Sequence, residues 1–180
     1  MKYHVLGLAV LLPMLGAATA QESADPAVVK RGEYLVTAMG CNDCHTPFTM
    51  GPNGPEPDMT KMLSGHPQEI VITEPIVLAD PWLAASSATN TAHSGPWGVS
   101  FTANLTPDPE TGVLRDYTVE QFIQMMRTGR KQGQGRPILP PMPWPPFGHL
   151  TDEDLTAIYA YLRQIPPIPN KVPDPLPPAQ

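Results

Sequence analysis

The chain has 180 residues, with 17 acidic and 11 basic side chains and a formal net charge of -6 at pH 7. This acidic balance disfavours nucleic acid as a partner, because phosphate backbones are bound through Lys and Arg. Proline is the strongest signal in the composition, with 25 residues. We therefore expect one domain dominated by loops. Its own apolar side chains are too few to form a sufficient core, so we expect something else to add to that core.

The first twenty residues predict a secretory signal peptide. They begin with Lys2, continue as an apolar run from Val5 to about Leu15, and end in a small-x-small sequence at Ala20. A retained membrane anchor is the alternative, but the run is shorter than the roughly 20 residues that a span requires. We expect cleavage after Ala20, export to the periplasm, and no integral membrane segment afterwards.

Three segments of the following domain, residues 21–165, predict amphipathic helices. Residues 25–40 start with an Asp-Pro N-terminus and end at a glycine. Residues 118–129 open with a capping box completed by Gln121. Residues 151–164 place three acidic side chains at the positive end of the helix dipole.

The remaining long segments predict little regular structure. Residues 48–98 show little periodic apolar pattern and are interpreted as a long loop insertion with no strand-rich region, in which His66 and His93 are solvated. Residues 166–180 are too rich in proline to continue a helix. We expect an extended, inert tail there, with a docking strap as the alternative.

The sequence "GCNDCHTP", residues 40–47, contains both cysteines of the chain. Its spacing fits a redox dithiol, part of a zinc site, or covalent haem. A thioredoxin-like dithiol would begin a helix after a strand, and zinc would need a fourth ligand that no paired histidine supplies. Covalent haem explains all the features together, with Cys41 and Cys44 bonded to the vinyl groups and His45 bound to the iron.

Several further segments accompany this motif: "FTANLTPDPETGV", "QFIQMMRTG", "ILPPMPW" and "LTDEDLTAIYAYLR". Together they resemble the class I cytochrome c family over roughly residues 26–165, and within it the haem domains of bacterial alcohol and gluconate dehydrogenase cytochrome subunits. The resemblance implies a mainly α, class I cytochrome c fold, with about three helices around one covalent haem c. Those subunits carry three such motifs and a membrane anchor, whereas this chain has one motif.

The resemblance also implies details of packing and ligation. Gly32 matches the small residue at which the first and last helices cross, with Tyr34 or Leu35 and Tyr159 as neighbours. The ring of His45 is expected to donate to the carbonyl of Pro52 or Pro55, which fixes its orientation.

Met142 is the predicted sixth ligand of the iron. It stands between prolines that stiffen an extended segment, and it precedes the last helix in the order seen in class I cytochromes. Three other methionines lie on predicted helices and are expected in the core: Met39, Met125 and Met126. Three more lie in the long loop and are weaker candidates for the ligand: Met50, Met59 and Met62. His149 is a minor competitor for the iron.

Other side chains have two interpretations each. Four aromatic residues are expected to pack on the haem, with ordinary core packing as the alternative: Trp97, Phe101, Trp144 and Phe147. Four basic residues form either a solvated loop or a patch for an acidic redox partner or the haem propionates: Arg127, Arg130, Lys131 and Arg136. Asn104 is expected to hold a turn through its side-chain amide.

These features predict a single-haem electron carrier of the periplasm rather than an enzyme. Its expected partners are redox proteins, with a dehydrogenase on one side and a terminal oxidase or reductase on the other. One alternative is an electron-entry subunit fixed to a dehydrogenase. The other is a haem sensor or catalyst with an open axial position.

Overall fold

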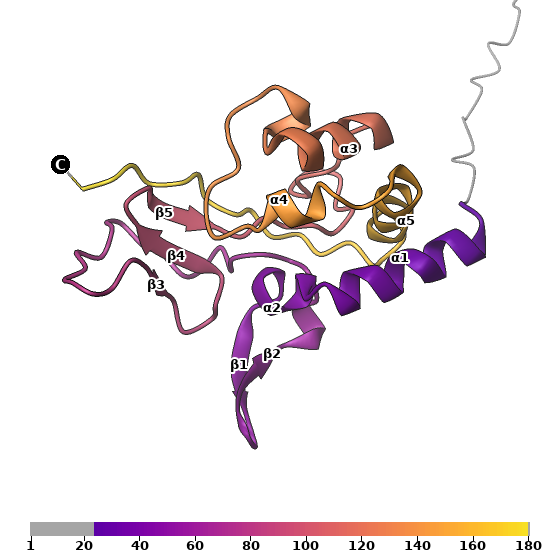
Figure 1. Ribbon diagram of the computed structural model, residues 1–180. Helices are drawn as coiled ribbons and strands as arrows, with labels where there is room; N and C mark the ends of the chain where they lie inside the picture. The colour runs from indigo at the N-terminus through magenta and orange to yellow at the C-terminus, as the bar shows by residue number, and fades with distance from the viewer. Residues whose placement is uncertain (1–23, 180) are drawn as a thin grey trace, which may run out of the picture.

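The computed structural model describes residues 24–179, so the predicted signal peptide lies outside the described residues. Two α-helices begin this part of the chain, the five strands follow, and the other three α-helices come last (Figure 1). The α-helices are α1 (Pro26–Ala38), α2 (Cys41–His45), α3 (Val119–Thr128), α4 (Trp144–Phe147) and α5 (Asp152–Leu162), and the 3-10 helices are η1 (Met59–Lys61) and η2 (Lys131–Gly133). Between residues 24 and 179, no helix has the length and apolar character needed to cross a bilayer.

The five strands form two small antiparallel sheets. β1 (Phe48–Gly51) pairs with β2 (Gly54–Pro57), and β3 (Ala85–Ser86), β4 (Ala92–Gly95) and β5 (Gly98–Phe101) follow one another in the second sheet. The expectation of a mainly α fold is therefore met only in part, because five α-helices are accompanied by two small sheets. All five strands fall between residues 48 and 101, where no strand-rich region was expected. These strands are short and rich in glycine, proline and serine, so their stability comes from pairing with neighbours rather than from an alternating apolar pattern.

The three predicted helices are confirmed, and so are their caps. Asp25 accepts a hydrogen bond from the Ala27 amide at the start of α1. The Thr118 side chain and the Gln121 side chain form a reciprocal capping box at α3. Thr151 caps α5 by accepting from the Asp154 amide at 3.2 Å.

α1 and α5 cross in direct contact at Gly32. A Cβ placed on Gly32 would overlap the Ala157 carbonyl and would lie 2.8 Å from Tyr161 Cβ. Arg31 adds an ion pair to Asp154 across the same crossing, at 2.8 Å. Tyr34, one of the expected neighbours, is instead 61 % exposed and lies beneath the Arg31 guanidinium, so Leu35 fills the buried position.

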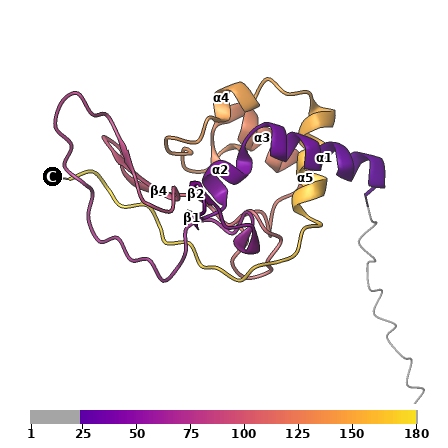
Figure 2. The same cartoon turned by 90° about the horizontal axis from the view of Figure 1, so that it is seen from below.

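The proline-rich tail is extended as expected, but it also makes contacts that contribute to the fold. It runs from the end of α5 to the edge of β5, at the far end of the molecule from α1 (Figures 1 and 2). Leu176 exchanges two backbone hydrogen bonds with Val99 of β5, at 2.9 and 3.1 Å. The tail therefore extends the second sheet by one short pairing.

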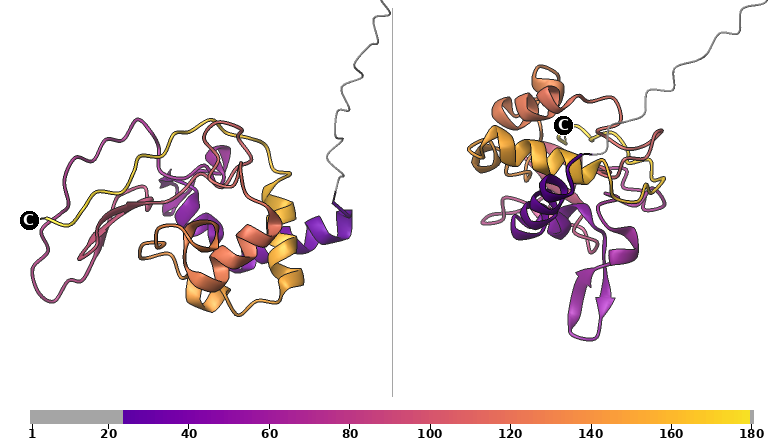
Figure 3. Two further views of the ribbon diagram at one scale, coloured as in Figure 1. Left: turned by 90° about the horizontal axis from the view of Figure 1, so that it is seen from above. Right: turned by 90° about the vertical axis from the view of Figure 1, so that its right-hand side faces the viewer.

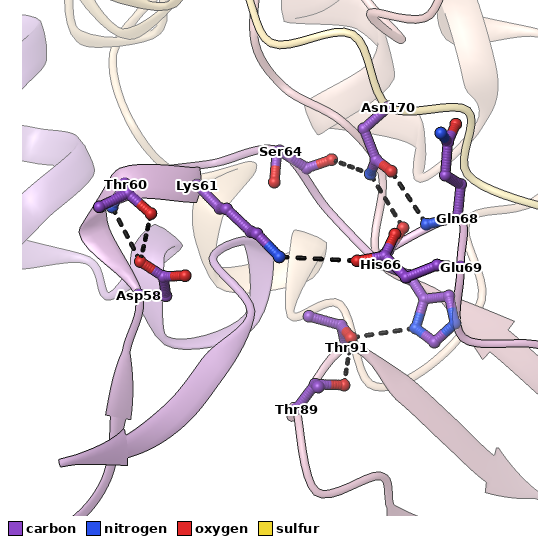
Figure 4. Close-up of polar contacts among 10 residues, drawn as sticks. All are labelled: Asp58, Thr60, Lys61, Ser64, His66, Gln68, Glu69, Thr89, Thr91 and Asn170. Atoms are coloured by element: carbon purple, nitrogen blue, oxygen red, sulfur yellow. Dashed lines mark hydrogen bonds and ion pairs between the residues drawn. The ribbon is translucent and has the colours of Figure 1, made fainter.

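Two buried asparagines attach the tail to the domain. Asn104 accepts from the Thr106 amide, which confirms its turn, and also donates to the Ile168 carbonyl at 2.9 Å. Asn170 donates to the carbonyls of Ser64 and His66 and accepts from the Gln68 amide (Figure 4). These bonds satisfy buried backbone groups that would otherwise have no partner.

Asn170→Leu is expected to lower the free energy of unfolding by about 3 kcal/mol. The substitution leaves two buried carbonyls and one amide without partners, and each such loss costs about 1–3 kcal/mol before the apolar gain of Leu. Urea unfolding of the purified protein measures the difference. Asn53→Ala, in the exposed turn between β1 and β2, is the control and should change stability by less than about 0.5 kcal/mol. Equal midpoints for the two variants would contradict this role of the tail.

The expectation that His66 and His93 are solvated is also wrong. His66 is fully buried, with one ring nitrogen beside Thr91 Oγ1 at 3.0 Å and the other beside the Ile70 carbonyl at 2.9 Å. Both nitrogens are satisfied, so the neutral ring can be buried at little cost. Burial lowers the pKa of His66 and of His93 below the ordinary value.

Candidate haem-binding site

A cavity of about 210 Å³ lies between the helices and the second sheet. Its walls come from the end of α1, from α2, α3 and α5, from β5, and from residues 138–143. The lining is mostly apolar, with core side chains such as Leu114, Phe122, Leu155 and Ile158. Figure 3 shows these elements from two further directions.

The Cys-x-x-Cys-His sequence forms α2 and lines this cavity. Gly40 precedes it with φ 69°, a left-handed conformation that favours glycine and lets α2 start immediately after α1. Cys41 and Cys44 are three positions apart on one helical turn, and both are free thiols. The spacing therefore places both sulfurs on the same side of α2.

The electrostatics of the thiols argue against a reactive dithiol. Burial raises the pKa of Cys41 to about 11, and burial also raises the pKa of Cys44. Reactive dithiols need the opposite shift, because the thiolate is the nucleophile. The structure also gives no support to a zinc site, because residues 24–179 contain no cluster of three or more His, Cys, Asp or Glu side chains suited to a metal ion.

His45 is buried in the cavity wall and is oriented by a backbone carbonyl. Its Nδ1 lies 2.8 Å from the Ala103 carbonyl oxygen. The expectation of Pro52 or Pro55 as the acceptor is wrong, because those residues lie in the β1–β2 hairpin, which projects away from the helices (Figure 1). Burial lowers the pKa of His45, which favours the neutral imidazole and leaves Nε2 as the nitrogen available to a metal.

Met142 lines the same cavity, just before α4. The segment that carries it is fixed to β5, because Ser100 donates a hydrogen bond to the Pro140 carbonyl at 2.6 Å. The methionines of the long loop are not among the lining residues, and Met50 and Met59 are 78 % and 57 % exposed. Met39, at the C-cap of α1, and Met125 and Met126 of α3 do line the cavity.

The structure divides the four expected aromatic residues into two pairs. Phe101 and Phe147 line the cavity. Trp97 instead packs over Gly95 and donates to the His93 carbonyl, and Trp144 packs against Gly129 at the end of α3. Both tryptophans lie beside glycines, which leave room for a ring close to the backbone.

The four basic residues make different contacts. Arg127 is bonded to the Gly148 carbonyl and to Asp152, and Arg130 bonds to the Gly135 carbonyl. Lys131 and Arg136 line the cavity and are its charged lining residues within the described chain. Burial lowers the pKa of Lys131, and the nearby Arg136 cation lowers it further, so an anion at this position would be stabilised.

The cavity residues that the sequence analysis did not assign to the site include His93, Ser100 and Thr102. His93 and Ser100 face each other across the β4–β5 pair, and Thr102 follows two positions after Ser100, so they share one face of the sheet. His93 Nε2 and Thr102 Oγ1 are buried without a hydrogen-bond partner among the described residues. Without the strand pairing, the sequence offered no signal that these residues would meet.

The chain is similar to several curated proteins over most of its length. It is 33 % identical over 162 residues to the cytochrome c subunit of alcohol dehydrogenase (quinone) from Gluconobacter oxydans, covering 88 % of this chain and 26 % of that protein. It is 32 % identical over 155 residues to the gluconate 2-dehydrogenase cytochrome c subunit of Pantoea cypripedii, covering 86 % of this chain and 27 % of that protein. The chain is a c-type cytochrome related to these subunits. The resemblance expected from the motifs is thereby confirmed.

The fructose dehydrogenase cytochrome subunit of Gluconobacter japonicus extends the same group, at 29 % identity over 134 residues, or 74 % of this chain and 20 % of that protein. The cytochrome thus spans about a quarter of the length of the relatives it matches. No family model matches the chain.

The residues of this cytochrome fit haem c. Two thiols one helical turn apart suit the two vinyl groups, and the neutral, oriented imidazole of His45 suits the iron. The apolar walls suit the macrocycle. Lys131 and Arg136 are two cations in a cavity whose lining has no carboxylate, which matches the two negative propionates of haem.

Proposed function

We propose that this cytochrome is a single-haem electron carrier of the periplasm, moving electrons from a dehydrogenase to a terminal oxidase or reductase. The observation that carries the proposal is the convergence of Cys41, Cys44, His45 and Met142 on one apolar cavity. Bound haem would supply one-electron chemistry at iron. Both cysteines of the chain are used by one haem, so one haem per chain is proposed.

The chain's own residues would hold the iron in a fixed environment. His45 would bind the iron through Nε2 while the Ala103 carbonyl fixes its ring, and Met142 would supply a second protein ligand. With two protein ligands on the iron, a substrate would have no access to it, which fits an electron carrier better than an enzyme. The α1–α5 crossing and the α2 motif support a class I cytochrome c arrangement, to which the two small sheets are additions.

The test is to produce the full chain together with haem-attachment machinery and to count haem. We expect one covalent haem per chain, recovery from the periplasmic fraction, reversible one-electron reduction, and slow carbon monoxide binding to the ferrous protein. Rapid carbon monoxide binding without denaturant would overturn the carrier in favour of an open-site sensor or catalyst. A chain without covalent haem would overturn the whole proposal.

A second candidate is a permanent electron-entry subunit of a dehydrogenase. The relatives are subunits by name, and this chain exposes large apolar side chains on residues 70–83, which a free monomer rarely does. Purification from the native host distinguishes the two. Constant co-elution with a catalytic subunit supports this candidate, and a free monomer supports the mobile carrier.

Ser100→Ala is expected to loosen the proposed Met142 ligand without removing it. The hydroxyl of Ser100 is buried, and losing its bond to the Pro140 carbonyl should cost about 1–2 kcal/mol. The thioether-to-ferric absorption band should therefore disappear at a lower urea concentration than in the parent protein. Thr49→Ala, exposed on β1, should leave that midpoint unchanged. If Ser100→Ala also leaves it unchanged, the bond does not position the Met142 segment.

A further inference from the structure

Residues 69–84 form an open loop at the end of the molecule that lies away from α1 and α5 (Figures 2 and 3). We call this segment the apolar arm. The described residues include nine exposed large hydrophobic side chains, and six belong to the arm: Ile70, Val71, Ile76, Val77, Trp82 and Leu83. Val77 is 86 % exposed and Trp82 is 72 % exposed. Clusters of this kind mark surfaces that bind a partner.

Hydrogen bonds to the rest of the domain fix the position of the arm. At its base, His66 contacts the Ile70 carbonyl while its other nitrogen meets Thr91 (Figure 4). In its middle, the Ile76 amide donates to Ser94 Oγ of β4 at 2.9 Å. The residue just before the arm is also bonded to the tail, because the Gln68 amide donates to Asn170. A surface fixed in this way loses little conformational entropy on binding.

The negative charge of the arm favours a protein partner over an anionic membrane. It contains three acidic residues, Glu69, Glu74 and Asp80, and no basic residue. An anionic membrane surface would repel it, since such surfaces attract Lys and Arg. A protein face with apolar centre and basic rim is complementary instead.

The backbone of the arm points to the same conclusion. Between residues 71 and 84, the amides with intramolecular hydrogen bonds are those of Ile76 and Trp82. Most of the remaining backbone groups need partners that acyl chains cannot supply. A groove in a protein can supply them by pairing with the extended chain.

We propose that the apolar arm docks into an apolar groove with a basic rim on the catalytic subunit of a dehydrogenase, the electron donor of this cytochrome. The inference rests on the proposed function, and it names the surface through which that function is exercised. Val77 and Trp82 are the central contacts, because they are the most exposed aliphatic and aromatic side chains of the arm.

Site-specific photocrosslinking of the full chain in its native host tests the proposal. A benzophenone amino acid is placed at Val77 or at Trp82, and in a matched control at Met50, which is 78 % exposed on the β1–β2 hairpin. Mass spectrometry then identifies each adduct. We expect a dehydrogenase catalytic subunit at the two arm positions and no such adduct at Met50.

The remaining outcomes overturn the proposal. A lipid adduct would assign the arm to the membrane, an adduct with a second copy would assign it to self-association, and no adduct would show that the arm faces solvent. An adduct with a protein other than a dehydrogenase would likewise remove the stated partner.

A kinetic experiment separates failure of this docking surface from failure of the carrier function. The double variant Val77→Ser, Trp82→Ser should lower kcat/KM for cytochrome reduction by the crosslinked dehydrogenase about tenfold, as expected for loss of central interface contacts. Met50→Ser should change it less than twofold. If the double variant is reduced as fast as the parent, the arm is not the docking surface, although the carrier function stands. If the parent itself accepts no electrons from that enzyme, the proposed function fails as well.

Discussion

Met142→Ala should leave the haem covalently attached but change the absorption spectrum, the ligand binding and the reduction potential of the iron. The thioether-to-ferric band should vanish, ferrous iron should bind carbon monoxide rapidly, and the potential should fall by on the order of 0.1–0.2 V, part of the roughly 0.8 V range that axial ligands span. The cause is loss of a thioether that stabilises the ferrous state. Absorption spectra measure the band and carbon monoxide binding, redox titration measures the potential, and denaturing gels stained for haem measure the covalent attachment.

The matched control for this variant is Met59→Ala. Met59 is 57 % exposed in η1 and does not line the cavity, so its removal should leave the band and the potential unchanged. If Met142→Ala keeps the band, the sixth ligand is another methionine. Met125 and Met126 would then be tested before Met59 or Met62, because they line the cavity and the loop methionines do not.

Local sequence signals predicted the helices and the haem-attachment motif because each depends on neighbours along the chain. The capping box of α3 needs only Thr118 and Gln121, three residues apart. The positions of Cys41, Cys44 and His45 are likewise set within one short helix. Short-range spacing determines such features before tertiary contacts form.

Features that depend on distant partners were the ones missed. The acceptor for His45 is Ala103, 58 residues away, and the sequence offers no pattern that connects them. His66 and the pairing of Leu176 with Val99 are similar cases, because burial follows from contacts between segments that look like loops in isolation.

The residues of α4, "WPPF", form a helix because prolines are tolerated in a first helical turn.

Proline explains both the success and the failure of the loop predictions. It correctly excludes long helices from residues 48–98 and 166–180, because it removes an amide donor and clashes with the preceding turn. It does not exclude short strands at a sheet edge, such as β2 with Pro55 and Pro57 or the pairing beside Pro175 and Pro177. A proline-rich segment can therefore be ordered where neighbouring segments supply the partners.

Gly32→Ala should destabilise the folded protein by about 3 kcal/mol, although alanine is the better helix former. In an exposed helix this substitution gains about 1 kcal/mol. Here the added Cβ would overlap the Ala157 carbonyl and approach Tyr161 Cβ, so α1 and α5 would have to separate. Such overpacking typically costs 1–3 kcal/mol or more, and an overlap with backbone belongs at the upper end.

The separation should also reach the proposed haem site, because α1 leads directly through Gly40 into α2. Urea unfolding followed by far-ultraviolet circular dichroism measures the stability, and the thioether-to-ferric band reports on the site in the same titration. Lys30→Ala, exposed on the same helix, should change stability by less than about 0.5 kcal/mol. A Gly32→Ala protein as stable as the Lys30→Ala control would mean that the two helices do not touch at Gly32. A protein that is destabilised while its band persists to the unfolding midpoint would confine the effect to the crossing and leave α2 undisturbed.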